Sequence, residues 1–359
     1  MEIIVLMASA HDSHYHKRLN ALKKAGHKVT AYGFQRNVSL DNSTLKDINL
    51  LPKVENGKYI NRITTVYKAI SHVIAKHGKN VIYYATTFDI AIVCFHKHVK
   101  YIYGISDLVH SSFPQFLRQL FIQIDKKLIR NSICTVLTSE GFFSYLHLSP
   151  KDMKKCILVK NKLDSVFKNI ERPLLNNSEK KSGIRFGFAG NIRYETTLLF
   201  AEIIGKSFPQ HQFIFWGSGQ KQTIKKVEDL CSSYSNISYK GPFSNPVDLS
   251  SVYESIDIMV CNYDTKTINE RLAEPNKLYE CIFFNRPIIV TEGTYLGDSV
   301  KRLDIGTEIN NSETNIYKFI KSLKPEKIEV WQLNESSIST IDLIEDFSPL
   351  FTSLPTQER

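Results

Sequence analysis

Short apolar runs alternate with amphipathic stretches along most of the chain, and this alternation limits the possible folds more than any other feature. The first run, Glu2–Ala8, is apolar at almost every position, and a helical pattern that ends at Gly26 separates it from the next run, Lys28–Tyr32. Parallel strands are buried on both faces, so they read as continuous apolar runs, and helices connect them. The sequence therefore predicts an α/β protein with doubly wound parallel sheets. Further strands are predicted at Asn80–Ala85, Lys100–Ile105, Ser132–Thr138 and Lys155–Val159, and helices at Ile60–Lys76, Phe88–His96, Pro114–Arg130 and Gly141–Leu148.

The alternation stops in the polar segment 169–183 and then resumes, which predicts two domains. We expect an N-terminal Rossmann-like domain over residues 1–168, a linker over 169–183, a second Rossmann-like domain over 184–335, and a C-terminal helix within 336–359 that returns to the first domain. Two such domains would face each other across a ligand cleft. Strands of the second series are predicted at Ile184–Phe188, Gln212–Trp216, Ile237–Tyr239, Ile256–Cys261 and Pro287–Thr291.

Apolar residues recur at every third position near the end of the chain, at Ile338, Ile341, Ile344 and Phe347. This spacing predicts one apolar face of a short helix. Pro349 should stop that helix, because proline lacks the N–H that a helix interior requires.

Basic residues are concentrated in the first half of the chain. Residues 1–170 contain 25 Lys and Arg against 11 Asp and Glu, whereas residues 171–359 contain 21 against 25, and the whole chain carries a formal charge of +10. A basic surface attracts phosphate groups, nucleic acid or an anionic membrane. The start of the chain lacks the basic residues of a secretory signal, and no apolar run reaches the roughly 18 residues that span a bilayer. We therefore expect a cytoplasmic protein with reduced, buried cysteines, whose basic half meets phosphate groups or the inner face of a membrane rather than nucleic acid.

The segment Glu274–Glu280, EPNKLYE, is typical of a helix start that binds an anion. Pro275 suits the first turn, and the N-terminus of a helix offers unpaired N–H groups and a partial positive charge to a group such as a diphosphate. Lys277 adds a positive charge that opposes the helix dipole, so it serves a ligand better than it serves the helix. Glu280 can accept hydrogen bonds from a ribose diol. The alternative is a capped surface helix with a local Lys277–Glu280 pair.

The longer segment Pro275–Val290, PNKLYECIFFNRPIIV, resembles the donor-binding segment of GT-B glycosyltransferases of the family 4 type. In that family, a helix carrying Lys and Glu precedes an apolar stretch and a strand that opens with Pro, and it binds the diphosphate and ribose of a nucleotide sugar. The resemblance implies that Asn276, Lys277 and Glu280 bind the donor. Glu280 matches the second Glu of the family's E-x7-E pattern, whereas Leu272 stands where the first Glu is expected.

The loop Phe188–Arg193, FAGNIR, also resembles this family, in which a basic side chain after the first strand of the C-terminal domain neutralises the donor diphosphate. The resemblance implies this role for Arg193, with Gly190 and Asn191 beside the donor. The alternative for Arg193 is a surface ion pair.

Two further turns extend the resemblance. Phe215–Gly219, FWGSG, matches the family's strand and glycine turn and implicates Gly217 and Gly219, although any tight strand-to-helix turn has the same pattern. Lys240–Phe243, KGPF, resembles the loop whose backbone reads the nucleobase, which implicates Gly241 and Phe243. Phe243 is equally well explained as a packing residue.

The N-terminal half offers Asp107 and His14 as candidate polar groups. Tyr103–Asp107, YGISD, resembles a strand end that faces the cleft in this family, so Asp107 would orient the acceptor hydroxyl or the donor sugar, or else cap the following helix. His14 lies in the loop after the first strand, near donor and acceptor in the family, or it is an ordinary surface histidine. The apolar pattern from Phe113 to Ile124, beside several basic residues, fits an interfacial amphipathic helix or a core helix.

These features predict a glycosyltransferase that moves a sugar from a nucleotide diphosphate to a polysaccharide or lipid-linked acceptor, with retention implied by the resemblance. Lys277 and Arg193 would stabilise the leaving diphosphate, so neither a metal nor a cofactor is expected. The pairs His14-x-His16 and His96-x-His98 do not share a helix face, which argues against metal ligation. The alternatives are a nucleotide-sugar 2-epimerase and a non-catalytic nucleotide- or nucleic-acid-binding protein.

Overall fold

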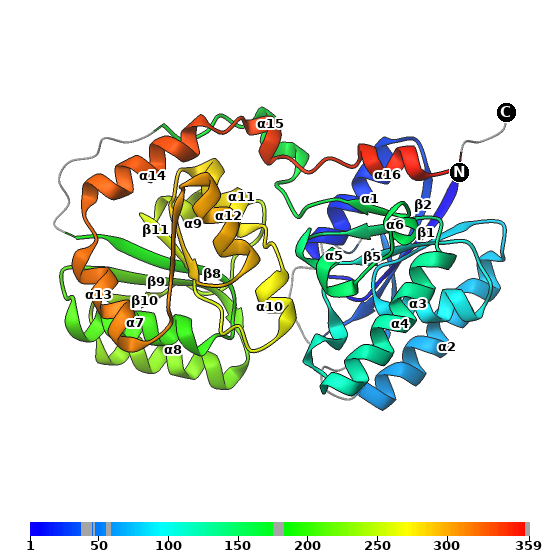
Figure 1. Ribbon diagram of the computed structural model, residues 1–359, viewed down its shortest axis with the longest axis horizontal. Coiled ribbons are helices and arrows are strands. Elements are labelled where there is room, and N and C mark those ends of the chain that lie inside the picture. Colours follow the sequence, from blue (N-terminus) through cyan, green and yellow to red (C-terminus); the bar gives the residue numbers. More distant parts are fainter. Residues whose placement is uncertain (37–44, 46, 55–58, 175–182, 356–359) are drawn as a thin grey trace. The chain divides into compact units, whose positions relative to one another are not determined.

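The computed structural model describes every residue except 37–44, 46, 55–58, 175–182 and 356–359. It divides into two compact units: unit 1 comprises Met1–Asn161 with Asp346–Arg359, and unit 2 comprises Lys162–Glu345. Each unit has a parallel sheet with helices on both faces, which confirms the predicted fold class (Figure 1). Among the described residues, no helix is both long and apolar enough to cross a bilayer.

Unit 1 is built on a seven-stranded parallel sheet with the order β3-β2-β1-β4-β5-β6-β7. Its central strand explains the first apolar run: Ile3, Val5 and Met7 belong to one core cluster, and Ile4 and Leu6, on the opposite face, are also buried. The strands are β1 Glu2–Met7, β2 Lys28–Gln35, β3 Ile48–Lys53, β4 Ile82–Ala85, β5 Tyr101–Ile105, β6 Thr135–Leu137 and β7 Cys156–Leu158.

Helices cover both faces of this sheet, with α1 and α16 on one side and α2, α3 and α4 on the other (Figure 1). Helix α1 begins after Asp12, whose side chain accepts a hydrogen bond from the N–H of His14, and it ends before Gly26, whose φ is +82°. The helices are α1 Ser13–Lys24, α2 Tyr59–His77, α3 Phe88–His96, α4 Gln115–Asn131, α5 Gly141–Leu146, α6 Pro150–Met153 and α16 Ser348–Ser353, with a 3-10 turn at Val109–Ser112.

Unit 2 is built on a six-stranded parallel sheet with the order β10-β9-β8-β11-β12-β13. The strand residues alternate between two core clusters: Ile258 and Val260 pack on one face, Met259 and Cys261 on the other. The strands are β8 Arg185–Ile192, β9 Gln212–Gly219, β10 Ile237–Tyr239, β11 Ile258–Cys261, β12 Ile288–Thr291 and β13 Gly306–Ile309.

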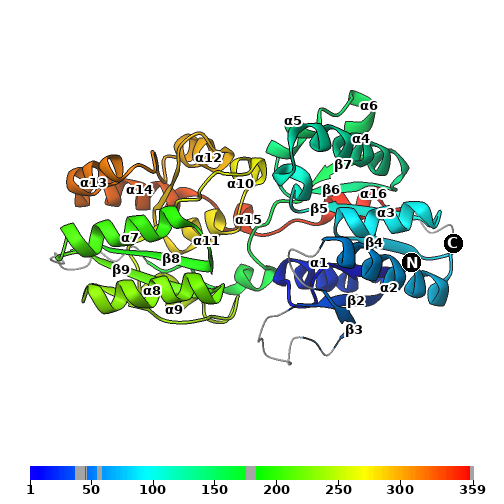
Figure 2. The same ribbon diagram turned by 90° about the horizontal axis from the view of Figure 1, so that it is seen from below.

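The helices of unit 2 form one layer on each side of the sheet. Helices α7 and α8 lie side by side on one face, as Figure 2 shows, whereas α9, α11 and α14 cover the other (Figure 1). The helices are α7 Glu195–Ser207, α8 Lys221–Ser233, α9 Leu249–Glu254, α10 Ile268–Leu272, α11 Lys277–Phe284, α12 Tyr295–Leu303, α13 Glu313–Ser322, α14 Pro325–Ser337 and α15 Thr340–Leu343, with a 3-10 turn at Ser165–Asn169.

The sequence prediction missed two strands, β3 and β13. Both lie at the edge of a sheet, and their residues are only partly buried. Such strands lack the continuous apolar run that marks the central ones. The sequence of β3 also contains Pro52, which an edge strand tolerates because one side makes no ladder hydrogen bonds.

The structure divides the chain at residues other than the predicted ones. Leu163 and Phe167, expected in the first domain, pack in the core of unit 2. Arg172, expected in the linker, donates hydrogen bonds to the carbonyls of Ile282 and Phe283 at the end of α11 and to Ile338 after α14. The segment before residue 175 therefore fastens two helix ends of unit 2, and residues 175–182 of the predicted linker lie outside the described residues.

A C-terminal helix, α16, belongs to unit 1, but the helix predicted over the apolar repeat 338–347 is wrong. Its four apolar residues do not share a face, because α15 spans only Thr340–Leu343 and the chain is extended at Ile344. Ile344 is buried in unit 2 and Phe347 packs on the core of unit 1, whereas Ile341 is 61% exposed. Pro349 lies in the first turn of α16 and begins a helix instead of ending one.

Leu350→Ala should test the packing of α16. Leu350 is fully buried in the core of unit 1, so its truncation should lower the free energy of unfolding by about 2–5 kcal/mol, as measured by urea denaturation. The matched control is Ile341→Ala, which removes a largely exposed side chain and should change stability by less than about 0.5 kcal/mol. The reverse ranking would contradict this packing.

Candidate functional site

The carboxyl ends of β8 and β9 bring four of the predicted site residues together. Gly190 pairs with Gly217, and Asn191 and Ile192 pair with Ser218 and Gly219. A Cβ built on Gly217 would lie 1.8 Å from the carbonyl oxygen of Gly190, and both glycines have φ near +130°. The two backbones approach too closely for any side chain at residue 217.

The predicted nucleobase loop joins this edge. The N–H of Gly217 donates to the carbonyl of Gly241 at 2.8 Å, and the Tyr239 hydroxyl donates to the carbonyl of Gly217 at 2.9 Å. Phe243 packs against the core cluster that contains Leu278 and Tyr279. The three turns at residues 190, 217 and 241 therefore form one continuous backbone surface.

Lys277, the first residue of α11, extends its ammonium group to this surface. A Cβ built on Gly190 would come within 2.8 Å of Lys277 Nζ, so a side chain at residue 190 would displace the lysine. The same Nζ lies 5.6 Å from the ring centroid of Phe188 in β8. The aromatic face and the carboxyl end of β8 thus hold a positive charge beside a bare stretch of backbone.

Glu280, one turn further along α11, is held by three neighbours instead of by Lys277. Its Oε1 accepts from the side-chain amides of Asn245 at 3.0 Å and Asn276 at 2.5 Å, and its Oε2 accepts from the Tyr253 hydroxyl at 2.8 Å. Burial and the adjacent Glu280 carboxylate raise the pKa of Tyr253 well above its usual value, so this hydroxyl remains a donor. A carboxylate has about four acceptor positions, so Glu280 retains room for one more donor.

Glu274, out of register with the family pattern, is also buried. The hydroxyl of Tyr279 donates to its carboxylate, and the Lys162 ammonium lies 5.7 Å from the centroid of the Tyr279 ring. These contacts lie inside unit 2, so they favour an anchoring role for Glu274 at the start of α11.

Arg193 lies on an aromatic stack. Its guanidinium is 4.9 Å from the ring centroid of Tyr194, and its Nη2 donates to the Tyr194 hydroxyl at 2.6 Å. Tyr194 in turn stacks on Tyr263 with a centroid separation of 4.4 Å. Arg193 lies on the ring of Tyr194, whereas Lys277 lies near the ring of Phe188. That both cations contact one diphosphate remains a prediction.

Asn245 and Tyr253, which orient Glu280, are not predicted by any sequence motif. They lie outside the quoted motifs, in the loop before α9 and in α9 itself. No spacing rule relates them to Glu280, because three separate loops and helices bring them together only in the folded unit.

His14 and Asp107 belong to unit 1, where they follow β1 and β5. The 3-10 turn after Asp107 has Leu108 at its N-cap position. Burial raises the pKa of Asp12, and the charge of Asp107 adds to this effect, whereas the N–H of His14 opposes it. Asp12 is therefore a further polar residue at this edge, and its only sequence signal is its position before a helix.

Helix α4 has a buried face and also exposes large apolar side chains. Ile122, Leu128 and Ile129 are buried in the unit, whereas Phe116 and Leu120 are 73% and 55% exposed. In the described part of the chain, no group of three or more His, Cys, Asp or Glu residues could hold a metal ion.

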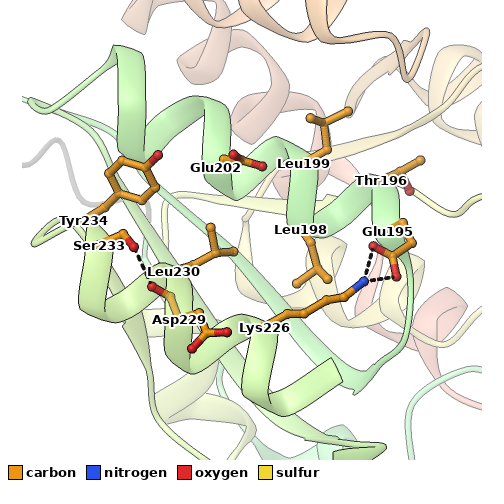
Figure 3. Close-up of a pocket in the computed structure, with 10 residues that line it drawn as sticks. All are labelled: Glu195, Thr196, Leu198, Leu199, Glu202, Lys226, Asp229, Leu230, Ser233 and Tyr234. Carbon is orange, nitrogen blue, oxygen red and sulfur yellow. Dashed lines mark hydrogen bonds and ion pairs between the residues drawn. The ribbon is translucent and has the colours of Figure 1, made fainter. Parts of the chain in front are cut away.

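A hollow of about 550 Å³ lies between α7 and α8, away from these residues (Figure 3). Lys226 crosses it to pair with Glu195 at 2.7 Å, and Leu199 and Leu230 contribute apolar surface. None of the predicted site residues lines it.

Comparison with known proteins gives a clear answer for the fold. No family model matches the sequence, and no curated protein matches it. Among solved structures, HepE from Anabaena, in complex with UDP and glucose, has a TM-score of 0.69 at 12% identity, covering 99% of this chain and 100% of HepE. WaaG, a glycosyltransferase involved in lipopolysaccharide biosynthesis, has a TM-score of 0.67 at 12% identity, with 98% of each chain covered. The chain has the GT-B fold.

The GT-B fold is shared with a protein described as a candidate UDP-N-acetylglucosamine 2-epimerase from Listeria monocytogenes, with a TM-score of 0.66 at 12% identity over 94% of this chain and 92% of that one. The predicted resemblance to GT-B proteins is thus confirmed at the level of fold. At such low identity, the GT-B fold by itself does not assign an activity.

Gly217→Ala should show that the backbone contact at this edge is indispensable. The new Cβ would meet the carbonyl of Gly190, so we expect a loss of about 3 kcal/mol or more in the free energy of unfolding. Gly293→Ala is the matched control, because Gly293 also has a positive φ but has open space around it, and it should cost about 1–2 kcal/mol. Equal losses in the two variants would contradict the close approach.

Proposed function

We propose that the chain is a glycosyltransferase whose unit 2 binds a nucleotide-diphosphate sugar. The observation that carries this proposal is the ammonium of Lys277 beside the bare backbone of Gly190 and Gly217. This edge is also where strand order reverses, between β8 and β11, and ligands of doubly wound sheets bind at such a point.

The chemistry follows from charge. Transfer of the sugar releases a nucleoside diphosphate, and the negative charge that develops on the leaving oxygen needs stabilisation. Lys277 supplies one positive charge at the backbone surface, and Arg193 supplies a second from the loop after β8. Glu280, oriented by Asn245 and Tyr253, accepts a hydrogen bond from the ribose. In this scheme the two cations stabilise the leaving diphosphate without a metal ion.

The donor is proposed to be a uridine diphosphate sugar, because the similar HepE structure holds UDP and glucose. The acceptor is proposed to be a saccharide or lipid-linked intermediate bound by unit 1, with retention of configuration, as the resemblance to family 4 implies. Asp107 and His14 would then orient the acceptor or the transferred sugar.

Peripheral contact with a membrane is a further part of the proposal. Phe116 and Leu120 expose apolar surface on α4, and Lys127 and Arg130 on the same helix are also exposed. An exposed apolar face flanked by positive charges suits the surface of an anionic bilayer.

A 2-epimerase is the second candidate, because the protein from Listeria monocytogenes shares the fold. The two activities differ in their need for an acceptor. Incubation with UDP-N-acetylglucosamine alone, followed by chromatography of the nucleotide sugars, should return the unchanged substrate or its slow hydrolysis products. An epimerised nucleotide sugar would favour the second candidate.

Lys277→Ala tests the donor site directly. Loss of one charge-assisted contact to a diphosphate should weaken UDP binding about 10- to 100-fold in isothermal titration calorimetry. The control is Lys301→Ala, which removes the same charge from an exposed pair with Glu308 and should leave the affinity unchanged. Undiminished UDP binding and turnover in Lys277→Ala would exclude the proposed role.

A further inference from the structure

The side chain of Arg172 holds the carboxyl end of helix α11 in unit 2. Its Nε donates to the carbonyl of Phe283 at 3.2 Å, and its Nη2 donates to the carbonyl of Ile282 and, at 3.0 Å, to Asn285 Oδ1. Ile282 and Phe283 lie in the last turn of α11, and Asn285 is its C-cap residue, with φ +51°. The last carbonyls of a helix have no partner within the helix, so this guanidinium supplies donors that the helix end lacks.

The same guanidinium reaches the end of α14. Its Nη1 donates to the carbonyl of Ile338 at 2.6 Å, and its Nη2 lies 3.0 Å from the carbonyl of Glu335. Helices α11 and α14 pack against each other, so Arg172 joins the ends of two neighbouring helices. A guanidinium is a planar fork of N–H groups, and the compact ammonium of a lysine could not reproduce this arrangement.

A chain of hydrogen bonds also leads from Arg172 to the carboxylate of Glu280. Arg286 Nη1 donates to the carbonyl of Asn285 at 3.1 Å, and Arg286 Nε donates to the carbonyl of Tyr253 at 2.8 Å. The Tyr253 hydroxyl then donates to Glu280 Oε2 at 2.8 Å. Arg172 therefore supports α11 in two ways, directly at its last carbonyls and through the residues that orient Glu280.

In the described part of the chain, the amino end of α11 has no side-chain cap, because Asn276 at the N-cap position makes no such hydrogen bond. Lys277 in the first turn opposes the helix dipole. A helix of eight residues is marginal by itself, so α11 depends on contacts with the rest of unit 2. A positive charge at the carboxyl end interacts favourably with the dipole, so Arg172 fixes the helix from the end that lies away from Lys277.

We propose that Arg172 is a positioning residue for the nucleotide site, because it sets the placement of α11 and so of Lys277 and Glu280. An α-helix rises 1.5 Å per residue, so Lys277 lies about 9 Å from Phe283 along the helix axis. A helix this short moves as one body, and a shift at the Arg172 end displaces the ammonium and the carboxylate together. That the ligand is a nucleotide rests on the proposed transferase function, whereas the placement of α11 does not.

Hydrogen–deuterium exchange of the full-length protein without nucleotide tests the placement of α11. The measured quantity is the exchange rate of the α11 amides relative to those of the core strand β11, so that a general loss of stability cancels. We expect Arg172→Gln to raise this ratio about tenfold or more, because the carbonyls of the last turn lose their donors. Arg172→Lys keeps the charge without the fork, and its ratio should be intermediate.

Lys155→Gln is the matched control for these variants. Lys155 also donates to carbonyls at a helix end, those of Arg130 and Ser132 at the end of α4, at 2.7 and 2.8 Å, but it does so in unit 1. Its replacement should leave the α11 ratio unchanged. An unchanged ratio in Arg172→Gln would overturn the proposal. If Arg172→Gln does not fold, an unchanged ratio in Arg172→Lys overturns it, since the ammonium cannot make both sets of bonds.

Isothermal titration calorimetry with UDP tests the consequence for the nucleotide. Arg172→Gln should weaken UDP binding about fivefold or more, whereas Lys155→Gln should retain the wild-type affinity. Because Arg172 acts in part through the Lys277 ammonium, Arg172→Gln should cause a smaller loss in a Lys277→Ala background than in the wild type. Equal losses in both backgrounds would indicate a stabilising role only and count against the proposal.

The two measurements separate this proposal from the proposed function. Failure of the wild-type protein to bind UDP would contradict the donor site, while faster exchange of α11 in Arg172→Gln would still support the placement of α11 by Arg172. Unchanged UDP affinity in Arg172→Gln, when the wild type binds UDP, would overturn the positioning role and leave the donor site standing.

Discussion

The sheet of unit 2 depends on the close approach of two backbones at Gly190 and Gly217. Because no side chain fits there, β8 and β9 continue their pairing to the last residue of each strand. The same absence of side chains leaves peptide groups bare beside Lys277. A requirement of sheet packing and a surface suited to a phosphate group therefore arise from the same two residues.

Much of this fold was predictable, because the central strands of both sheets are buried on both faces. Ile258–Cys261 is a clear example: its four residues alternate between two cores, so all four must be apolar. The strands β3 and β13 contain exposed or partly buried positions and do not carry this constraint, which is why they were not predicted. The helix predicted from the C-terminal apolar repeat is wrong because Ile344 and Phe347 pack in the cores of two different units. A periodic pattern cannot distinguish residues that fill one core from residues that fill two.

The candidate site was predictable where a local motif places a residue at a strand end or a helix start. Gly190, Gly217 and Lys277 meet in this way, because parallel strands all end at the same edge. The partners of Glu280 were not predictable, since Asn245 and Tyr253 lie 35 and 27 residues away along the chain and meet it only after folding.

The two ends of unit 2 are bonded to each other. The N–H of Leu163 donates to the carbonyl of Leu343, and the N–H of Glu345 donates to the carbonyl of Leu163, at 2.9 and 3.0 Å. Unit 1 resumes at Asp346 and completes its core with Leu350. In topological terms, unit 2 is a domain inserted between β7 and α16 of unit 1, with its entry and exit side by side. A chain organised in this way can exchange unit 2 as a single segment, because one pair of adjacent cut points excises unit 2 while both unit 1 segments keep their sequence.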